Sequence, residues 1–268
     1  MCIKKILAWF HKPPEPLPEP VEHSDLILLT FGKNNYGGGN DLRGCVNDSK
    51  NLSAKLLELI PSFYIKKFLD ADVTVARYKS EVSKAIDTLN PGAVVVVMAD
   101  SCFSESITRL VNSNPHPIKN RFINPELPPR INVGKKLFKS RDIRWIVMSG
   151  CQEHQTSADA YIDGKYVGAF TYFAIKALKE GMTYREWHNE ILRYLPGGEF
   201  NQVPTLEGPE ELLNKVMFED ETLIIHNSSH GTYTYDEHGD EEDGYDEALY
   251  FDKMLIDDDL GEILDKIK

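Results

Sequence analysis

The chain has 268 residues, 41% of them apolar, which is enough for one sizeable hydrophobic core but not for a second full domain. Its first apolar segment, MCIKKILAWF, is about half the length of a membrane-spanning helix, and no small-residue cleavage site follows it. We therefore expect a cytoplasmic protein without a transmembrane span. The cysteines form no CxxC pair, which argues against a zinc ribbon and a dense disulfide framework; they are Cys2, Cys45, Cys102 and Cys151.

The formal charge of −12 is concentrated at the C-terminal end of the chain. Residues 219–268 contain 17 Asp and Glu against 3 Lys, a net of −14, which leaves +2 for residues 1–218. No strongly basic stretch occurs outside one short loop, so nucleic acid is not an expected partner. A cation or a cationic substrate suits this charge distribution better.

The N-terminal part divides into three predicted regions. Residues 1–11 form a short amphipathic segment, and residues 12–22 form a stiff proline-rich linker. Residues 23–268 are predicted to form a single domain. It begins with a buried strand at 25–32, which runs into a loop rich in Gly and Asn.

The rest of the domain alternates between helical and strand patterns. A helix is predicted at 45–60, a strand and turn at 63–74, and a helix at 75–89 that ends at NPG. Buried strands follow at 93–99 and 143–151, then a helix at 170–181 closed by Gly181, and finally the segments VPTLEG and ETLIIHNSSHG. This order predicts an α/β fold with a mainly parallel central β-sheet flanked by helices.

Reactive side chains follow three of these strand patterns. Cys102 and Cys151 each come directly after a buried strand, and His230 follows ETLIIHNSS. Sites in parallel sheets lie at the carboxyl ends of the strands, where a thiol and an imidazole can together carry out nucleophilic acyl transfer. Taken singly, a cysteine after a buried strand is more often an inert core thiol.

Several motifs together resemble the metacaspases, the caspase-like cysteine peptidases of clan CD. They are DLRGCVND, DSCFSES, SGCQEHQTSADA, GAFTYF and HNSSHGT followed by DEHGDEEDGYDE, and the similarity covers residues 25–268. The resemblance implies a caspase-like fold and a catalytic dyad of Cys102 and His230, with oxyanion donors at the backbone N–H groups of Gly231 and Cys102. It also implies cleavage of peptides and proteins after Arg or Lys. The implied substrate-binding residues are Cys45, Asp48, Asp100 and Ser228.

The resemblance further implies an activating calcium ion. Its motif positions place candidate ligands at Asp246 and in the IDDDL segment, at Asp257, Asp258 and Asp259. Carboxylate oxygens suit Ca²⁺. A solvated acidic face is the alternative reading of the same residues.

The order of the motifs departs from that of the family. In metacaspases the histidine motif precedes the cysteine motif, whereas here Cys102 comes before His230. We therefore predict a permuted strand order, in which residues 219–268 are a transposed segment. Its strand at 221–226 is expected to insert between those at 26–31 and 93–99, within the chain or by exchange with a second copy. The C-terminal helix LGEILDKIK should end beside NPGAVVVV.

The loop at 109–144 is basic, with nine Lys and Arg against two acidic residues. We interpret it as a site of self-cleavage, with a solvated insertion as the alternative. The sequence thus predicts a cysteine endopeptidase specific for Arg or Lys and stimulated by calcium. The competing hypothesis is a catalytically weak caspase-fold module with a regulatory or binding role.

Overall fold

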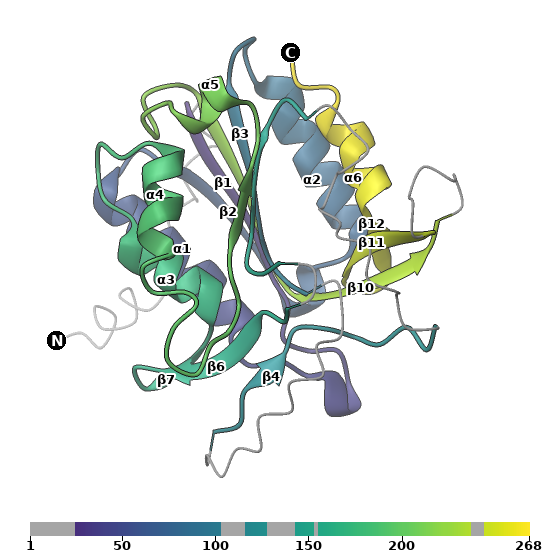
Figure 1. The fold of residues 1–268 in the computed structure, drawn as a ribbon. Coiled ribbons are helices and arrows are strands. Elements are labelled where there is room, and N and C mark those ends of the chain that lie inside the picture. Colours follow the sequence, from purple (N-terminus) through teal and green to yellow (C-terminus); the bar gives the residue numbers. More distant parts are fainter. Residues whose placement is uncertain (1–24, 103–115, 128–142, 153–154, 237–243) are drawn as a thin grey trace, which may run out of the picture.

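The computed structural model describes residues 25–102, 116–127, 143–152, 155–236 and 244–268. The predicted N-terminal segment and linker lie outside these ranges, as does most of the basic loop. The described chain forms a six-stranded sheet in the order β2-β1-β9-β3-β5-β8, parallel except for β8 (Figure 1). Its strands are β1 (Leu26–Gly32), β2 (Tyr64–Leu69), β3 (Val94–Asp100), β5 (Ile146–Ser149), β8 (Thr205–Glu207) and β9 (Thr222–Ser228).

The strand from the C-terminal segment lies in the middle of this sheet, as the sequence predicts. β9 pairs in parallel with β1 on one side and with β3 on the other, within its own chain. All seven β9 residues are buried, which fits a strand covered on both faces. The insertion of this segment between two strands that precede it by more than 100 residues is therefore confirmed.

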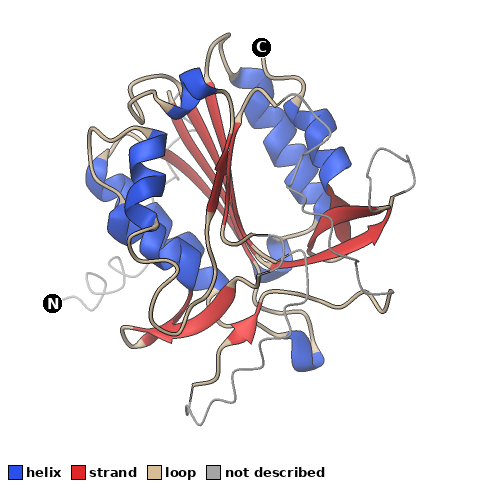
Figure 2. Ribbon diagram, in the orientation of Figure 1, coloured by secondary structure: helices blue, strands red, loops and turns tan. Residues whose placement is uncertain are grey.

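Helices cover both faces of the sheet, giving three layers (Figure 2). On one face lie α1 (Cys45–Leu59), α3 (Ala169–Ala177) and α4 (Tyr184–Ile191), and on the other lie α2 (Val75–Thr88) and α6 (Asp257–Leu264). Side chains alternate along β9, so Ile224 packs in the α1/α3/α4 core while Leu223 and Ile225 pack in the α2/α6 core. Short helices complete the set: α5 (Glu210–Leu213), η3 (Gly38–Asn40) and η4 (Asp70–Asp72).

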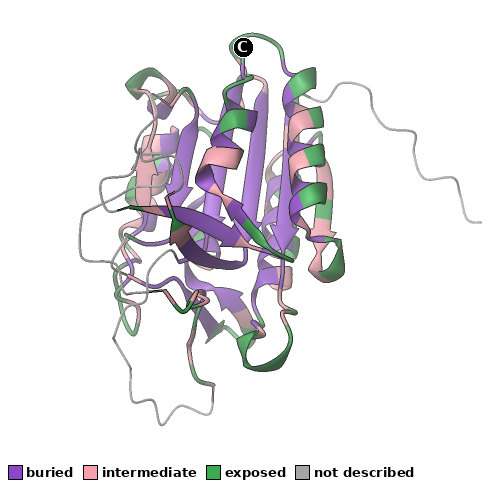
Figure 3. Ribbon diagram, turned by 90° about the vertical axis from the view of Figure 1, so that its right-hand side faces the viewer, coloured by how far each residue is buried: buried purple, intermediate pink, exposed green. Residues whose placement is uncertain are grey.

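Local sequence signals account for the helix ends. Thr74 caps α2 by accepting the Arg77 N–H, and Thr183 with Glu186 forms a capping box at the start of α4. The inner strands β1, β9, β3 and β5 are buried along almost their whole length, whereas the edge strand β2 is half-buried. The helices expose residues on their outer sides (Figure 3). Among the described residues, no helix is long and apolar enough to cross a membrane.

Two small sheets at the carboxyl end of the main sheet were not predicted. One contains β10 (His230–Tyr235), β11 (Tyr245–Tyr250) and β12 (Met254–Ile256). The other contains β4 (Lys119–Asn120), β6 (Ala158–Ile162) and β7 (Lys165–Gly168). They frame the region in which the predicted site residues meet.

The segment junctions meet at the opposite, amino end of the sheet. The Gly92 N–H donates to the carbonyl of Lys268 at 3.3 Å, so the C-terminal helix ends beside the turn that leads into β3. The Asn90 N–H donates to the Glu221 carboxylate at 2.8 Å. These contacts confirm the proximity of the segment ends that the sequence predicts.

Candidate active site

Strand register brings the first site residues together. Gly32, Ser228 and Asp100 are in register at the carboxyl ends of β1, β9 and β3. Ser228 lies on the same side of β9 as Ile224, the side covered by α1 and α3. α1 begins shortly after β1 and carries Asp48 in its first turn, so this carboxylate reaches the same point.

Three of the predicted substrate-binding residues contact the side chain of Arg121, which is fully buried; they are Asp48, Asp100 and Ser228. Its Nη2 lies 2.7 Å from the Asp48 carboxylate and 3.1 Å from that of Asp159. Its Nη1 lies 3.2 Å from the Asp100 carboxylate and donates to the Ser228 hydroxyl at 2.7 Å. Such charge-assisted bonds suit a guanidinium with its several donors. We call this site, with Gly168 as its wall, the arginine pocket.

Backbone and hydroxyl groups hold the pocket carboxylates in place. The Gly168 N–H donates to Asp48, and the Thr171 N–H and hydroxyl donate to Asp100 at 3.0 and 2.6 Å. The Ser157 hydroxyl also donates to Asp100. A Cβ atom at Gly168 would lie closest to Asp100 Oδ2, and 2.5 Å from Arg121 Nη1 and 2.7 Å from Arg121 Cζ. Only glycine at this position leaves room for the guanidinium.

The electrostatics of the pocket favour a bound cation. Burial raises the pKa of Asp48 to about 6 although Arg121 lowers it, and Asp100 adds a like charge. Burial acts to lower the pKa of Arg121, but the surrounding acidic groups outweigh it and the pKa is raised. Burial also raises the pKa of Cys45, so its thiol stays neutral. Three buried carboxylates without a guanidinium would carry uncompensated charge.

The backbone of Arg121 is bound as firmly as its side chain. Its carbonyl oxygen accepts the N–H groups of both Cys102, at 3.1 Å, and Gly231, at 2.9 Å. Its own N–H donates to the Ser157 carbonyl at 3.1 Å, and the Ile123 N–H donates to the Gly231 carbonyl at 3.0 Å. Residues 119–123 therefore lie as an added strand between β6 and β10, an arrangement used in peptide recognition.

His230 is fixed by a hydrogen bond to the backbone. Its Nε2 lies 2.6 Å from the Asn40 carbonyl oxygen, and because a carbonyl can only accept, Nε2 carries the hydrogen. The Nδ1 atom is then the basic nitrogen, and it is buried. Burial lowers the pKa of His230 to about 4, and the Asn40 carbonyl opposes the shift. The ring also packs edge-on against Tyr36, with centroids 4.6 Å apart.

Cys102 is buried and lies directly after β3. Its Sγ accepts the Ser157 N–H at 2.6 Å and lies 3.4 Å from the Ser157 carbonyl oxygen. Since Cys102 and Gly231 donate to one carbonyl oxygen, the cysteine and histidine segments meet there despite their separation in sequence. Acyl transfer requires a thiol, an oriented imidazole and N–H donors to the reacting carbonyl oxygen, and these groups occur in the segments that meet here.

The predicted calcium ligands do not gather in this way. Asp257, Asp258 and Asp259 are consecutive in the first turn of α6, so their side chains point in different directions, and Asp259 pairs with Lys79 at 2.7 Å. Their charges suit the positive end of the helix dipole. Asp246 lies on β11, buried in the small sheet.

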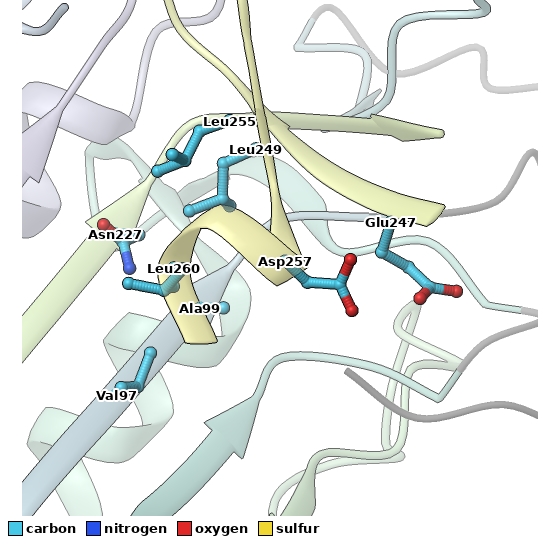
Figure 4. A pocket seen from close by; sticks show the side chains of 8 residues that line it. All are labelled: Val97, Ala99, Asn227, Glu247, Leu249, Leu255, Asp257 and Leu260. Carbon is cyan, nitrogen blue, oxygen red and sulfur yellow. The ribbon is translucent and has the colours of Figure 1, made fainter. Parts of the chain in front are cut away.

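One pair of buried acids lies nearby. Glu247 and Asp257 line a small cavity with apolar side chains of the main sheet and α6 (Figure 4). Throughout the described ranges, no three His, Cys, Asp or Glu side chains are grouped as metal ligands. The four predicted residues thus do not fit a calcium site as a set, and calcium stimulation stays a prediction.

Comparisons with known proteins give a similarity of fold alone. No family model matches the chain, and no curated protein matches it. The solved structure of protein GSU0716 from Geobacter sulfurreducens aligns with a TM-score of 0.52 at 19% identity, covering 72% of this chain and 97% of that one. The likeness supports the α/β architecture and carries no functional information.

Sequence reasoning missed several residues of the site. Arg121 is one of nine basic residues in its loop, and nothing in the sequence distinguishes it from the others. Asp159 and Gly168 stand in the motifs QTSADA and GAFTYF, which the resemblance includes without giving these residues a role. The Asn40 contact uses a backbone carbonyl, so no side-chain pattern could indicate it.

Proposed function

We propose that this protein is a cysteine endopeptidase of the metacaspase type, with a caspase-like fold, that cleaves peptide bonds after Arg or Lys. One observation carries the proposal: the chain's own Arg121 places its guanidinium among three carboxylates and its carbonyl oxygen on the N–H groups of Cys102 and Gly231. Two N–H groups, those of Cys102 and Gly231, thus meet on the carbonyl that precedes the bond between Arg121 and Phe122.

The proposed reaction gives each part of the site a role. His230 Nδ1 takes the proton of the Cys102 thiol, and the thiolate attacks the carbonyl carbon of the bound arginine. The N–H groups of Cys102 and Gly231 stabilise the oxyanion. The imidazolium then protonates the leaving amine, which gives a thioester. Water activated by His230 hydrolyses the thioester and restores the thiol.

The bond between Arg121 and Phe122 is the proposed site of self-cleavage. Residues 1–121 contribute β2, β1 and β3 to the sheet, and residues 122–268 contribute β9, β5 and β8. Because β9 lies between β1 and β3, the two pieces share a continuous hydrogen-bonded sheet. Cleavage would therefore give a two-chain protein that stays assembled.

Mass spectrometry of the purified chain tests this proposal. Incubation, with and without calcium, should produce two fragments that end at Arg121 and begin at Phe122. The Cys102→Ala chain should remain intact under the same conditions. Identical intact masses for both chains would remove the claim of self-cleavage.

The competing function is a catalytically weak regulatory or binding module, and the occupation of the arginine pocket by Arg121 also favours it. The arginine pocket is already filled, so an external arginine can enter only if Arg121 leaves. A fluorogenic arginine amide separates the two functions. Turnover above the Cys102→Ala background supports the peptidase, whereas binding of an arginine peptide without turnover supports the module.

A further inference from the structure

A glycine-rich turn beside the site orients the candidate base. Residues 37–41 read GGGND, and Gly37 and Gly38 adopt φ values of 85° and 65°, which side chains other than glycine disfavour. The Asp41 carboxylate closes the turn by accepting the N–H groups of Tyr36 and Gly37 at 2.7 and 2.8 Å. The backbone carbonyl of Asn40, the residue before Asp41, accepts the hydrogen bond from His230 Nε2.

Lys119 binds the same turn from the docked segment. Its ammonium group donates to the Asp41 carbonyl at 2.7 Å and lies 3.4 Å from the Gly39 carbonyl oxygen. Lys119 is two residues before Arg121, so both side chains point to the same side of the added strand. Asn120 between them is exposed. The ammonium thus holds the two carbonyls that flank the one bound to His230.

We propose that the Gly39–Asp41 turn is a subsite for a basic residue two positions before the cleaved arginine, and that occupancy of this subsite holds Asn40 where it orients His230. The inference rests on the proposed peptidase function. The preferred substrate sequence is then basic-any-arginine, and the lysine of the substrate has a positioning role.

The coupling follows from the conformational freedom of the turn. A run of three glycines has many accessible conformations, and fixing one of them costs entropy. A bound ammonium offsets this cost with two charge-assisted bonds. Binding energy that orders a catalytic group appears in kcat, whereas uniform binding appears in KM alone.

Peptides test the subsite directly. The full chain is assayed with fluorogenic amides of acetyl-Ile-Lys-Asn-Arg and of the same peptide with norleucine in place of lysine, which keeps the stem and removes the charge. We expect kcat/KM to fall about tenfold with norleucine, as for loss of a charge-assisted bond at a half-buried site, mainly through kcat. Acetyl-Ile-Lys-Ala-Arg is the control and should match the parent peptide.

Self-cleavage gives a second readout. Because it is intramolecular, its first-order rate has no KM component. Lys119→Ala should slow the appearance of the fragments about tenfold, Lys119→Arg should restore the rate, and Asn120→Ala should leave it unchanged.

The outcomes separate the subsite from the proposed function. If no arginine peptide is turned over above the Cys102→Ala background, the peptidase proposal fails and this one with it. If lysine and norleucine peptides are cleaved equally well, the subsite is refuted while the arginine peptidase stands. A loss confined to KM, with unchanged kcat, refutes the link to His230.

Discussion

Substitution of Gly168 by Ala tests the arginine pocket with a single methyl group. Gly168 has φ −75° and ψ 130°, which alanine adopts without strain, and its N–H bond to Asp48 needs no side chain. The added Cβ would clash with both partners of one ion pair in the pocket: it would lie closest to Asp100 Oδ2, and 2.5 Å from Arg121 Nη1. Overpacking of this kind costs about 1–3 kcal/mol, and a cost of about 3 kcal/mol lowers a rate about 100-fold.

Two measurements follow from this substitution. Self-cleavage after Arg121 should fall about 100-fold in Gly168→Ala if the pocket no longer accepts the guanidinium. In the Cys102→Ala background, where no self-cleavage occurs, trypsin should cut after Arg121 faster in the Gly168→Ala variant, because the docked arginine is released from its buried site.

Gly92→Ala is the matched control for general destabilisation. Gly92 has φ 91° with open space around it, and it lies at the amino end of the sheet, away from the pocket. Alanine there should lower the free energy of unfolding by about 1 kcal/mol through backbone strain without slowing self-cleavage. A folded Gly168→Ala protein that cleaves itself at the unsubstituted rate would refute the pocket.

Three further predictions concern stability. Arg121→Ala should lower the free energy of unfolding by about 3–5 kcal/mol in urea titrations, because it leaves buried carboxylates unpaired, whereas the exposed Arg193→Ala should change it by less than about 0.5 kcal/mol. Burial lowers the pKa of His226 to about 4, so as pH falls from about 6.5 to 4 the unfolded chain takes up a proton that the folded chain does not. This histidine therefore accounts for a loss of about 3 kcal/mol over that window. The pKa of His230 is lowered to about 4 as well, so His226→Asn should reduce the total loss by that amount and leave the share of His230. The carboxyl group of Asp48 makes the free energy of unfolding depend on pH in the opposite direction. Its pKa is raised to about 6, so its stabilising contribution is complete below about pH 4 and is lost as pH rises to 6. Asp48→Asn should remove this contribution to the pH dependence in urea titrations across that range.

The main strands of the sheet could be predicted from the sequence because their signals are local and strong, whereas the place of β9 between β1 and β3 was implied by the family resemblance. Continuous apolar runs of strand length, such as VVVVM and TLII, indicate strands buried on both faces, and both are completely buried. The small sheets were missed because their strands have mixed composition and depend on pairing with distant segments. β6 and β7, for example, form a hairpin around Asp163 and Gly164 whose strand residues range from buried to exposed.

Some of the site residues that act through their side chains could be predicted from the sequence. Asp48, Asp100 and Ser228 stand in motifs and meet around one guanidinium. The guanidinium itself, that of Arg121, belongs to a loop in which nothing distinguishes one basic residue from another. Contacts made through carbonyl oxygens, including those of the 39–41 turn, leave no trace in the side-chain pattern. Three of the four predicted calcium ligands, Asp257, Asp258 and Asp259, are consecutive in α6, where helical geometry separates their side chains.

Under the proposed relation to the metacaspases, the geometry explains how the chain order could change while the site residues stay together. Ser228, Asp100 and Gly32 are placed by register within a parallel sheet, and register depends on which strands pair rather than on how they are connected. The segment ends whose order departs from that of the family lie at the amino end of the sheet, where Lys268 contacts Gly92 and Asn90 contacts Glu221. The site residues lie at the opposite, carboxyl end. The strand β9 therefore places the following His230 equally well whether its segment stands at the end of the chain or in the middle. Placement of these residues therefore depends on strand pairing. Cleavage after Arg121 leaves every strand pair of the main sheet in place, so it should preserve the site that carries out the cleavage.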